Sequence, residues 1–143
     1  MGIAYTCMPD RKLALVAWDG VVSRDEWFAH LQRMLADPDY APMQFQITDL
    51  RHASLSATIS SVEIQAMVDL IAGQRGRLSI ARVAIVAGDE WARPRIAEAA
   101  LESISVTAIV FNDLTTACMW LGVDAAAAAA DMERTRLKLR PPA

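Results

Sequence analysis

Cysteine is scarce in this chain of 143 residues: Cys7 and Cys118 are the only two, and they lie far apart, outside any C-x-x-C pattern. A small secreted domain held together by disulfides carries more cysteines at closer spacing. We therefore expect no disulfide framework and a reducing, cytoplasmic compartment.

Lysine and long apolar runs are scarce as well. The two lysines, Lys12 and Lys138, follow no glycine, whereas a phosphate-binding P-loop needs a lysine directly after its glycines. No window approaches the roughly 20 apolar residues that span a bilayer, and the N-terminus has no basic stretch followed by an apolar segment. These absences argue against nucleotide binding at a P-loop, export and membrane insertion.

Metal-ligand patterns and nucleophile motifs are also missing. A structural zinc site needs about four cysteines or histidines at paired spacing, but His30 and His52 are isolated in the sequence. The G-x-S-x-G motif of α/β hydrolases does not occur. Cys118 falls on the apolar face of an expected helix, where a buried thiol is more common than a reactive one. We expect no metal, no cofactor and no catalytic nucleophile.

The composition is that of a folded, single domain. Hydrophobic residues make up 54% of the chain and charged residues 22%, whereas a disordered chain is poor in apolar residues. The net charge is −3, which gives no general attraction to phosphate backbones. Nucleic acid is therefore not an expected partner.

Alternating periodicities predict an α/β domain with the element order ββαβαβαβα and a mixed five-stranded sheet. The first two strands are expected to be antiparallel neighbours joined by a turn, and Ser23 with Glu26 forms a capping box at the first helix. The expected strands cover residues 3–8, 12–18, 44–50, 80–86 and 106–111, and the expected helices cover 24–36, 60–74, 90–103 and a final segment after Asp113.

Gly122 is expected to interrupt the final helix before Asp124 restarts it. We treat 1–123 as the main domain and 124–143 as an alanine-rich helical extension of the same domain. Apolar residues in the extension are expected to be exposed, which would allow a homodimer, although short amphipathic tails also pack on their own domain. These residues are Met132, Leu137 and Leu139, and the basic residues that complement the negative end of the helix dipole are Arg134, Arg136, Lys138 and Arg140.

Four carboxylates fall at the expected C-terminal ends of strands, where parallel sheets gather their binding groups: Asp49, Asp89, Glu90 and Asp113. Asp113 is also a helix cap, and Asp89 and Glu90 suit the first turn of a helix. Glu90 and Asp89, together with Trp91 and Arg93, form a candidate cleft.

Asp49 lacks such a local explanation, and the expected loop after it, residues 51–59, is rich in hydroxyls. A phosphate on one of them would lie near the start of the following helix and pair with Arg51. Loop solvation and capping account for the same residues without any switch. The candidate switch or binding residues are Asp49, Arg51, Ser54, Ser56, Thr58 and Ser60.

Several strings match a known fold group: Trp18–Ser23, Ile47–Arg51, Arg82–Val86, Ala92–Arg93 after Asp89 and Glu90, and Val110–Asp113 with Ala117, Trp120, Leu121 and Gly122. Over most of residues 3–122 the chain resembles the STAS-like fold group, especially its stand-alone SpoIIAA-like branch. In anti-sigma-factor antagonists of this group, a serine or threonine between a strand and a helix is the phosphorylation switch, and its counterpart here is the segment 54–61. The Asp-Ser-Gly stretch of that group is absent, because Leu50 and Arg51 follow Asp49.

Three functions remain open at this point. The resemblance favours a non-catalytic regulatory module that binds a protein partner. The fold also resembles the lipid-binding Sec14 type, and methionines and tryptophans on the helix faces would suit a carrier or sensor of an apolar small molecule. The third alternative is an enzyme that uses Asp49, Asp89 or Arg93 in a cleft, although no nucleophile, base and orienting group occur together.

Overall fold

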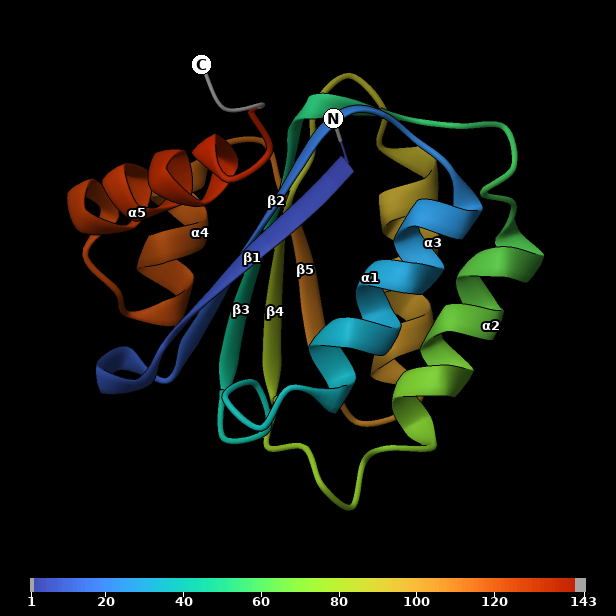
Figure 1. Ribbon diagram of the computed structural model, residues 1–143, viewed down its shortest axis with the longest axis horizontal. Helices are drawn as coiled ribbons and strands as arrows, with labels where there is room; N and C mark the ends of the chain where they lie inside the picture. Colours follow the sequence, from blue (N-terminus) through green and yellow to red (C-terminus); the bar gives the residue numbers. More distant parts are fainter. Residues whose placement is uncertain (1, 141–143) are drawn as a thin grey trace.

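The computed structural model describes residues 2–140, which form a five-stranded sheet with helices on both faces (Figure 1). The strands are β1 (Gly2–Met8), β2 (Leu13–Val22), β3 (Phe45–Leu55), β4 (Arg82–Val86) and β5 (Thr107–Phe111). The helices are α1 (Arg24–Ala36), α2 (Ser61–Ala72), α3 (Ala92–Glu102), α4 (Leu114–Leu121) and α5 (Ala125–Leu137), and a 3₁₀ turn, Pro9–Arg11, joins β1 to β2. The predicted mixed sheet is confirmed.

The order of the strands explains how the helices are distributed. The strands follow one another across the sheet in chain order; β1 is antiparallel to β2, and β2 to β5 are parallel. Three right-handed crossovers that step in one direction place their helices on the same face of a sheet. Accordingly α1, α2 and α3 cover one face, and α4 and α5 cover the other (Figure 1).

Two separate cores result, one on each face. The larger core packs the even-numbered β2 residues Ala14, Val16 and Trp18 against α1, α2 and α3. The smaller packs the alternate residues Leu13 and Leu15 against α4 and α5. Because successive side chains of a strand point to opposite faces, a strand covered on both faces is apolar at every position.

β2 extends further than the sequence predicts. We expected a strand over 12–18 that ends at Asp19 and Gly20, but β2 runs to Val22. A register shift between Ala17 and Asp19 bends the strand, and Gly20 adopts φ 73, which glycine tolerates without strain. Gly20 therefore marks an irregularity within the strand and not its end.

β3 extends in the same way, so the prediction of a loop from residue 51 is wrong. Residues 52–55 of β3 pair with 19–22 of β2, beyond the point where Asp49 pairs with Val86 of β4. Asp49 consequently lies within the strand and not at its C-terminal end. The extension depends on pairing between two segments that are far apart in the chain, which the local sequence pattern does not reveal.

The helix boundaries agree with the predictions to within two residues, and the Ser23–Glu26 capping box is present. The final segment forms two helices, because Gly122 adopts φ 72 and ends α4 before Asp124 caps α5. Met132, expected to be exposed, is fully buried in the smaller core, whereas Leu137 is 49% exposed. The division into 1–123 and 124–143 stays a prediction.

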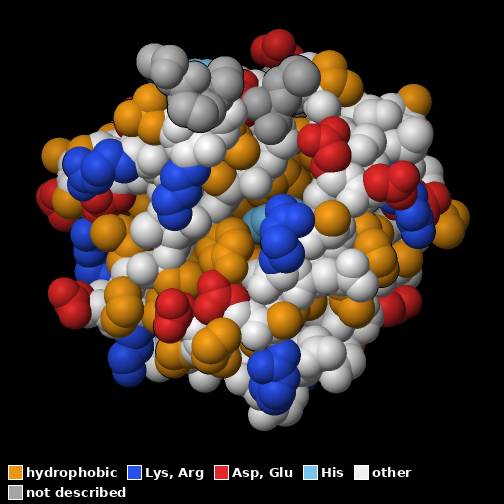
Figure 2. Space-filling view, in the orientation of Figure 1, with side chains coloured by type: hydrophobic (Ala, Val, Ile, Leu, Met, Phe, Trp, Pro, Cys, Tyr) orange, Lys and Arg blue, Asp and Glu red, His pale blue; other side chains and the backbone are white. Residues whose placement is uncertain are grey.

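α5 packs against the edge strand β1 and its neighbour β2 on one face of the sheet (Figure 1). Lys138 Nζ donates to the carbonyl of Tyr5 at 2.8 Å, and the Thr6 and Thr135 hydroxyls lie 2.8 Å apart. Figure 2 shows the face of the molecule on which β1 lies in front; near its middle, hydrophobic side chains lie next to a histidine and a basic side chain, and many other charged side chains lie around the rim. Within residues 2–140, no helix is long and apolar enough to cross a membrane.

Candidate functional site

Asp49, the central residue of the predicted switch, is fully buried on the face covered by α4 and α5. Its carboxylate accepts from Arg51 Nε and Nη2, both at 2.9 Å, and from Arg136 Nη2 of α5 at 2.6 Å. Arg136 also donates to the Trp18 carbonyl at 3.1 Å. Asp49 thus ties the last helix to β2 and β3. From the sequence, Arg136 was predicted only to complement the helix dipole, and this pair was not predicted.

The electrostatics of this group agree with a structural role. Burial alone raises the pKa of Asp49, but the hydrogen bonds from Arg51 and the charges of Arg51 and Arg136 lower it below its usual value. The carboxylate is therefore ionised, and both of its oxygens are occupied by arginine donors. This leaves little capacity to bind a further ligand.

The hydroxyls predicted to accompany Asp49 have other partners. Ser56 and Thr58 lie 3.0 Å apart, Thr58 accepts from the Arg24 backbone N–H at 2.9 Å, and Ser60 caps α2. In the described part of the chain, no hydrogen bond joins these side chains to Asp49. The structure therefore separates the predicted switch into a buried ion pair and an exposed hydroxyl segment.

Ser54 instead lies beside two residues of the predicted cleft. Together with Asp89 and Glu90 it lines a depression of about 100 Å³ between the end of β3 and the loop after β4. Gly88 allows the close approach of these segments, because a Cβ there would lie 3.2 Å from the Leu50 carbonyl oxygen. Trp91 does not line this depression and is 38% exposed at the start of α3.

Arg93 of α3 fixes the segment before α2. Its Nη atoms donate to the carbonyls of Leu55 at 2.8 Å, Ser56 at 2.6 Å and Ile59 at 3.0 Å. The remaining donors bind Glu90, one of them at 2.5 Å, and these bonds lower the pKa of Glu90. All five N–H donors of the guanidinium are therefore used within the protein.

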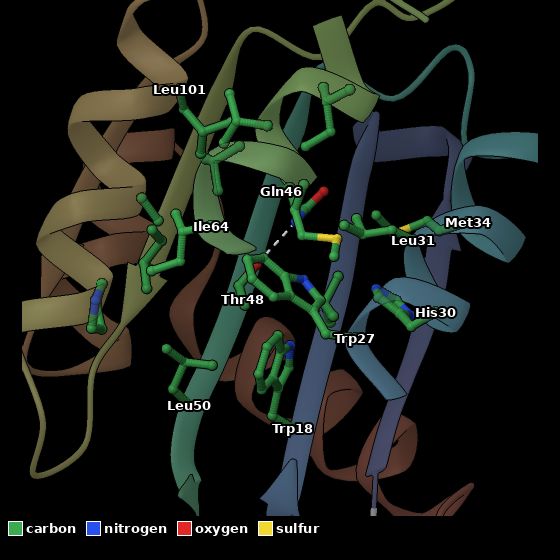
Figure 3. A pocket seen from close by; sticks show the side chains of 18 of the residues that line it. Trp18, Trp27, His30, Leu31, Met34, Gln46, Thr48, Leu50, Ile64 and Leu101 are labelled. Carbon is green, nitrogen blue, oxygen red and sulfur yellow. Dashed lines mark hydrogen bonds between the residues drawn. The ribbon is translucent and has the colours of Figure 1, made fainter. Parts of the chain in front are cut away.

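A cavity of about 110 Å³ lies between the sheet and helices α1, α2 and α3. Most of its lining is apolar and comes from all three helices and from β2, β3 and β4. In Figure 3, Leu31 and Met34 project from α1 on one side and Ile64 and Leu101 from the opposite side, with two tryptophans between them. The tryptophans are Trp18 and Trp27, whose ring centroids are 5.7 Å apart.

A chain of neutral polar groups crosses this apolar lining. Tyr40 Oη donates to Gln46 Oε1 at 2.6 Å, and Gln46 Nε2 donates to Thr48 Oγ1 at 2.9 Å. Gln46 and Thr48 are alternate residues of β3, so they face the same side of the sheet as the cavity (Figure 3). Because Thr48 Oγ1 accepts from Gln46, the Thr48 hydroxyl hydrogen is available to another acceptor.

His30 of α1 is the second polar feature of the cavity. The side chain is 2% exposed, and the centroid of its ring lies 5.7 Å from that of Tyr5 in an edge-on arrangement. Its Nδ1 has no hydrogen-bond partner within residues 2–140. Burial, and secondarily the charge of Arg33, lowers the pKa of His30 to about 4. The imidazole is thus neutral near pH 7.

His30, Gln46 and Thr48 were not predicted as site residues from the sequence. One signal was present: His30 lies three residues after Trp27 and four before Met34, on the apolar stripe of the helix. Within the described residues no group of three or more histidine, cysteine, aspartate or glutamate side chains is placed to hold a metal ion. Cys118 is fully buried in the smaller core, as predicted.

Comparison with known proteins identifies the fold. No protein-family model and no curated protein sequence matches the chain. Among solved structures, it is similar to an uncharacterised protein of the DUF3478 family with a SpoIIAA-like fold from Shewanella loihica PV-4. The two share 19% identity and a TM-score of 0.51, over 84% of this chain and 94% of the other. This chain therefore has the SpoIIAA-like fold that its sequence strings predicted.

Proposed function

We propose that this protein binds a small apolar molecule in the cavity between the sheet and helices α1 to α3. The observation that carries the proposal is a cavity of about 110 Å³ with an almost wholly apolar lining. Protein interiors are otherwise close-packed, and unfilled apolar space lowers stability. A bound molecule would restore the missing contacts.

The dimensions of the cavity limit the size of the ligand. Pockets for drug-sized molecules measure about 300–1,000 Å³, whereas an apolar cavity of about 150 Å³ holds one benzene. A volume of about 110 Å³ is somewhat smaller, so a single ring or a chain of similar bulk requires the surrounding side chains to move slightly. Met34 and Met67 line the cavity, and their flexible side chains can adjust to the shape of the guest.

The position of the carboxylates supports binding over catalysis. Asp49 lies on the opposite face of the sheet, paired with two arginines. Asp89 lines the depression at the end of β3 and not the cavity. Of the three residues suggested for an enzyme, only Arg93 lines the apolar site, and its donors are bound to Glu90 and to backbone carbonyls.

Toluene is a suitable first probe, with thermal unfolding and native mass spectrometry as readouts. Ala97 of α3 lines the cavity, so Ala97→Leu places extra methyl groups in the space that toluene needs. Ala99 is exposed on the same helix, and Ala99→Leu is the matched control. Toluene should raise the unfolding temperature of the wild type and of Ala99→Leu but not of Ala97→Leu. No shift in the wild type with any single-ring hydrocarbon would rule out the proposal.

A second proposed function, docking of a regulatory protein partner, is favoured by the surroundings of Ser56 and Thr58. Val62, in the first turn of α2, follows this segment in the chain and is 71% exposed. Trp91 is 38% exposed and lies two residues before Arg93, which donates to the Ser56 carbonyl. Wild-type chain and a Val62→Asp variant serve as paired baits in the native host. A partner retained only by the wild type, with phosphate on Ser56 or Thr58, would support docking. Equal retention by both baits would contradict it.

A further inference from the structure

The polar groups that line the cavity indicate the chemical character of the ligand as well as its size. This inference rests on the proposed binding of a small molecule and concerns the chemical group that such a molecule bears. Among the lining residues, Tyr40, Gln46 and Thr48 are neutral and hydrogen-bonded in series, and His30 is a neutral imidazole. Within residues 2–140, Arg93 is the only charged residue of the lining.

Arg93 has no capacity to bind an anion. Its guanidinium donates to three backbone carbonyls and to both oxygens of Glu90, which accounts for all of its N–H groups. A carboxylate or phosphate entering the cavity would lose its hydration without gaining a cationic partner, which is strongly unfavourable. The same holds for a cation, because Glu90 is already paired.

His30 is available to a ligand in a way that Arg93 is not. A buried polar group without a partner is destabilising by roughly 1–3 kcal/mol, so such groups are uncommon in native proteins. His30 is 2% exposed, lines the cavity and leaves Nδ1 unpartnered within residues 2–140. Thr48 presents a free hydroxyl hydrogen from the β3 side of the same cavity (Figure 3).

We propose that the ligand is a small uncharged molecule with one hydrogen-bonding oxygen, such as a phenol, alcohol or ketone, and that His30 and Thr48 recognise this oxygen. A neutral imidazole has one donor and one acceptor nitrogen, and a threonine hydroxyl also does both. The apolar lining holds the hydrocarbon part of the molecule, and the polar pair sets its orientation.

Three probes of similar bulk separate this proposal from simple apolar binding: toluene, p-cresol and 4-methylbenzoate at pH 7.5. One added neutral hydrogen bond predicts about three- to tenfold tighter binding of p-cresol than of toluene. 4-Methylbenzoate should not bind detectably. Titration calorimetry measures the three affinities on the full chain.

Substitutions then test the two residues. His30→Phe keeps the ring and removes both nitrogens, and Thr48→Val removes the hydroxyl. Each should reduce the preference for p-cresol over toluene while leaving the affinity for toluene within about twofold. His52→Phe, at an exposed position of β3, is the matched control and should retain the full preference.

The outcomes distinguish the two proposals. Equal affinities for toluene and p-cresol, or binding of 4-methylbenzoate as tight as that of p-cresol, would overturn the recognition of a neutral oxygen and leave the apolar site standing. Absence of binding by all three probes would overturn both. If His30→Phe does not fold, nitrogen NMR of the wild-type imidazole decides: its resonances should shift with p-cresol and stay in place with toluene.

Discussion

Asp49 and Arg136 form a buried ion pair between residues that lie 87 positions apart in the chain. Arg136 is 5% exposed, and its Nε has no hydrogen-bond partner in the described part of the chain. Asp49→Asn keeps the shape of the side chain but leaves the buried Arg136 charge with only the exposed Glu133 carboxylate, 3.6 Å from its Nε. Breaking such a pair lowers the free energy of unfolding by about 3–5 kcal/mol. Urea denaturation measures this loss.

The same substitution at an exposed cap is the control. Asp113 accepts from the Thr116 backbone N–H at 2.7 Å, and asparagine caps a helix about as well as aspartate, so Asp113→Asn should change stability little. Replacing both members of the pair, as Asp49→Leu with Arg136→Met, should recover most of the loss. If Asp49→Asn were as mild as Asp113→Asn, the pair would not anchor α5 in solution.

His30 gives stability a dependence on pH between about 4 and 6.5. The folded chain holds the pKa of this imidazole at about 4, whereas an unfolded chain has about 6.5. As the pH falls through this range, the imidazole is protonated in the unfolded chain but not in the folded chain, so the free energy of unfolding falls. Between pH 7.5 and pH 5 the loss from this group is about 2 kcal/mol. His30→Phe should remove that part of the pH dependence.

The second histidine provides the comparison. His52 is exposed, so His52→Phe should leave the difference in unfolding free energy between pH 7.5 and pH 5 close to that of the wild type. Urea midpoints at the two pH values suffice for all three proteins. Parallel pH profiles for the wild type and His30→Phe would show that the imidazole is not buried in its neutral form.

At the scale of elements, Gly122 controls the turn from α4 to α5. Its φ of 72 lies in the left-handed region, and a Cβ there would meet nothing within 4 Å. Gly122→Ala should therefore lower stability by about 1–2 kcal/mol through backbone conformation alone. Gly76→Ala is the matched control, because a Cβ at Gly76 also meets nothing within 4 Å and Gly76 has no left-handed φ. This substitution should leave stability unchanged or raise it slightly.

These two glycines can be compared by thermal denaturation. A similar melting temperature for Gly122→Ala and Gly76→Ala would mean that the α4–α5 turn adopts another backbone conformation in solution. A lower melting temperature for Gly122→Ala alone would support the left-handed conformation of Gly122, which ends α4 and allows α5 to pack against β1 and β2.

The helices were predictable because their signals are local. Ser23 and Glu26 lie three residues apart, and both halves of their capping box form as the sequence indicates. The extensions of β2 and β3 were not predictable, because each half lacks a strong strand pattern and exists only by pairing with the other. Met132 was misassigned for a similar reason: only the packing of α5 on the sheet shows which side of that helix is covered.

The candidate site was likewise predictable only where its sequence signals are local. Sequence patterns placed hydroxyls and carboxylates near the ends of β3 and β4, and Ser54, Asp89 and Glu90 do meet there. The cavity could not be located in this way, since its lining combines three helices and three strands. Whether space remains between such elements depends on how their side chains fit, which no local pattern contains.

At the scale of the whole molecule, the two faces of the sheet differ in how completely they are packed. The face under α4 and α5 is closed by the ion pair of Asp49 and by contacts from α5 to β1. The face under α1, α2 and α3 contains the cavity. Because segments with fewer buried contacts open at lower free energy, α1 to α3 should open more readily than the sheet and α5.

Hydrogen exchange under native conditions tests this difference together with ligand binding. A molecule that binds the closed form stabilises it by RT ln(1 + [L]/Kd), about 1.4 kcal/mol at ten times Kd. Toluene in the cavity should therefore slow exchange of those α1, α2 and α3 amides that exchange through partial opening, by up to about tenfold. Amides of α5 that exchange through local fraying should keep their rates, because that opening leaves the cavity intact. Slowing confined to α5, or the same slowing in Ala97→Leu as in the wild type, would place toluene outside the cavity.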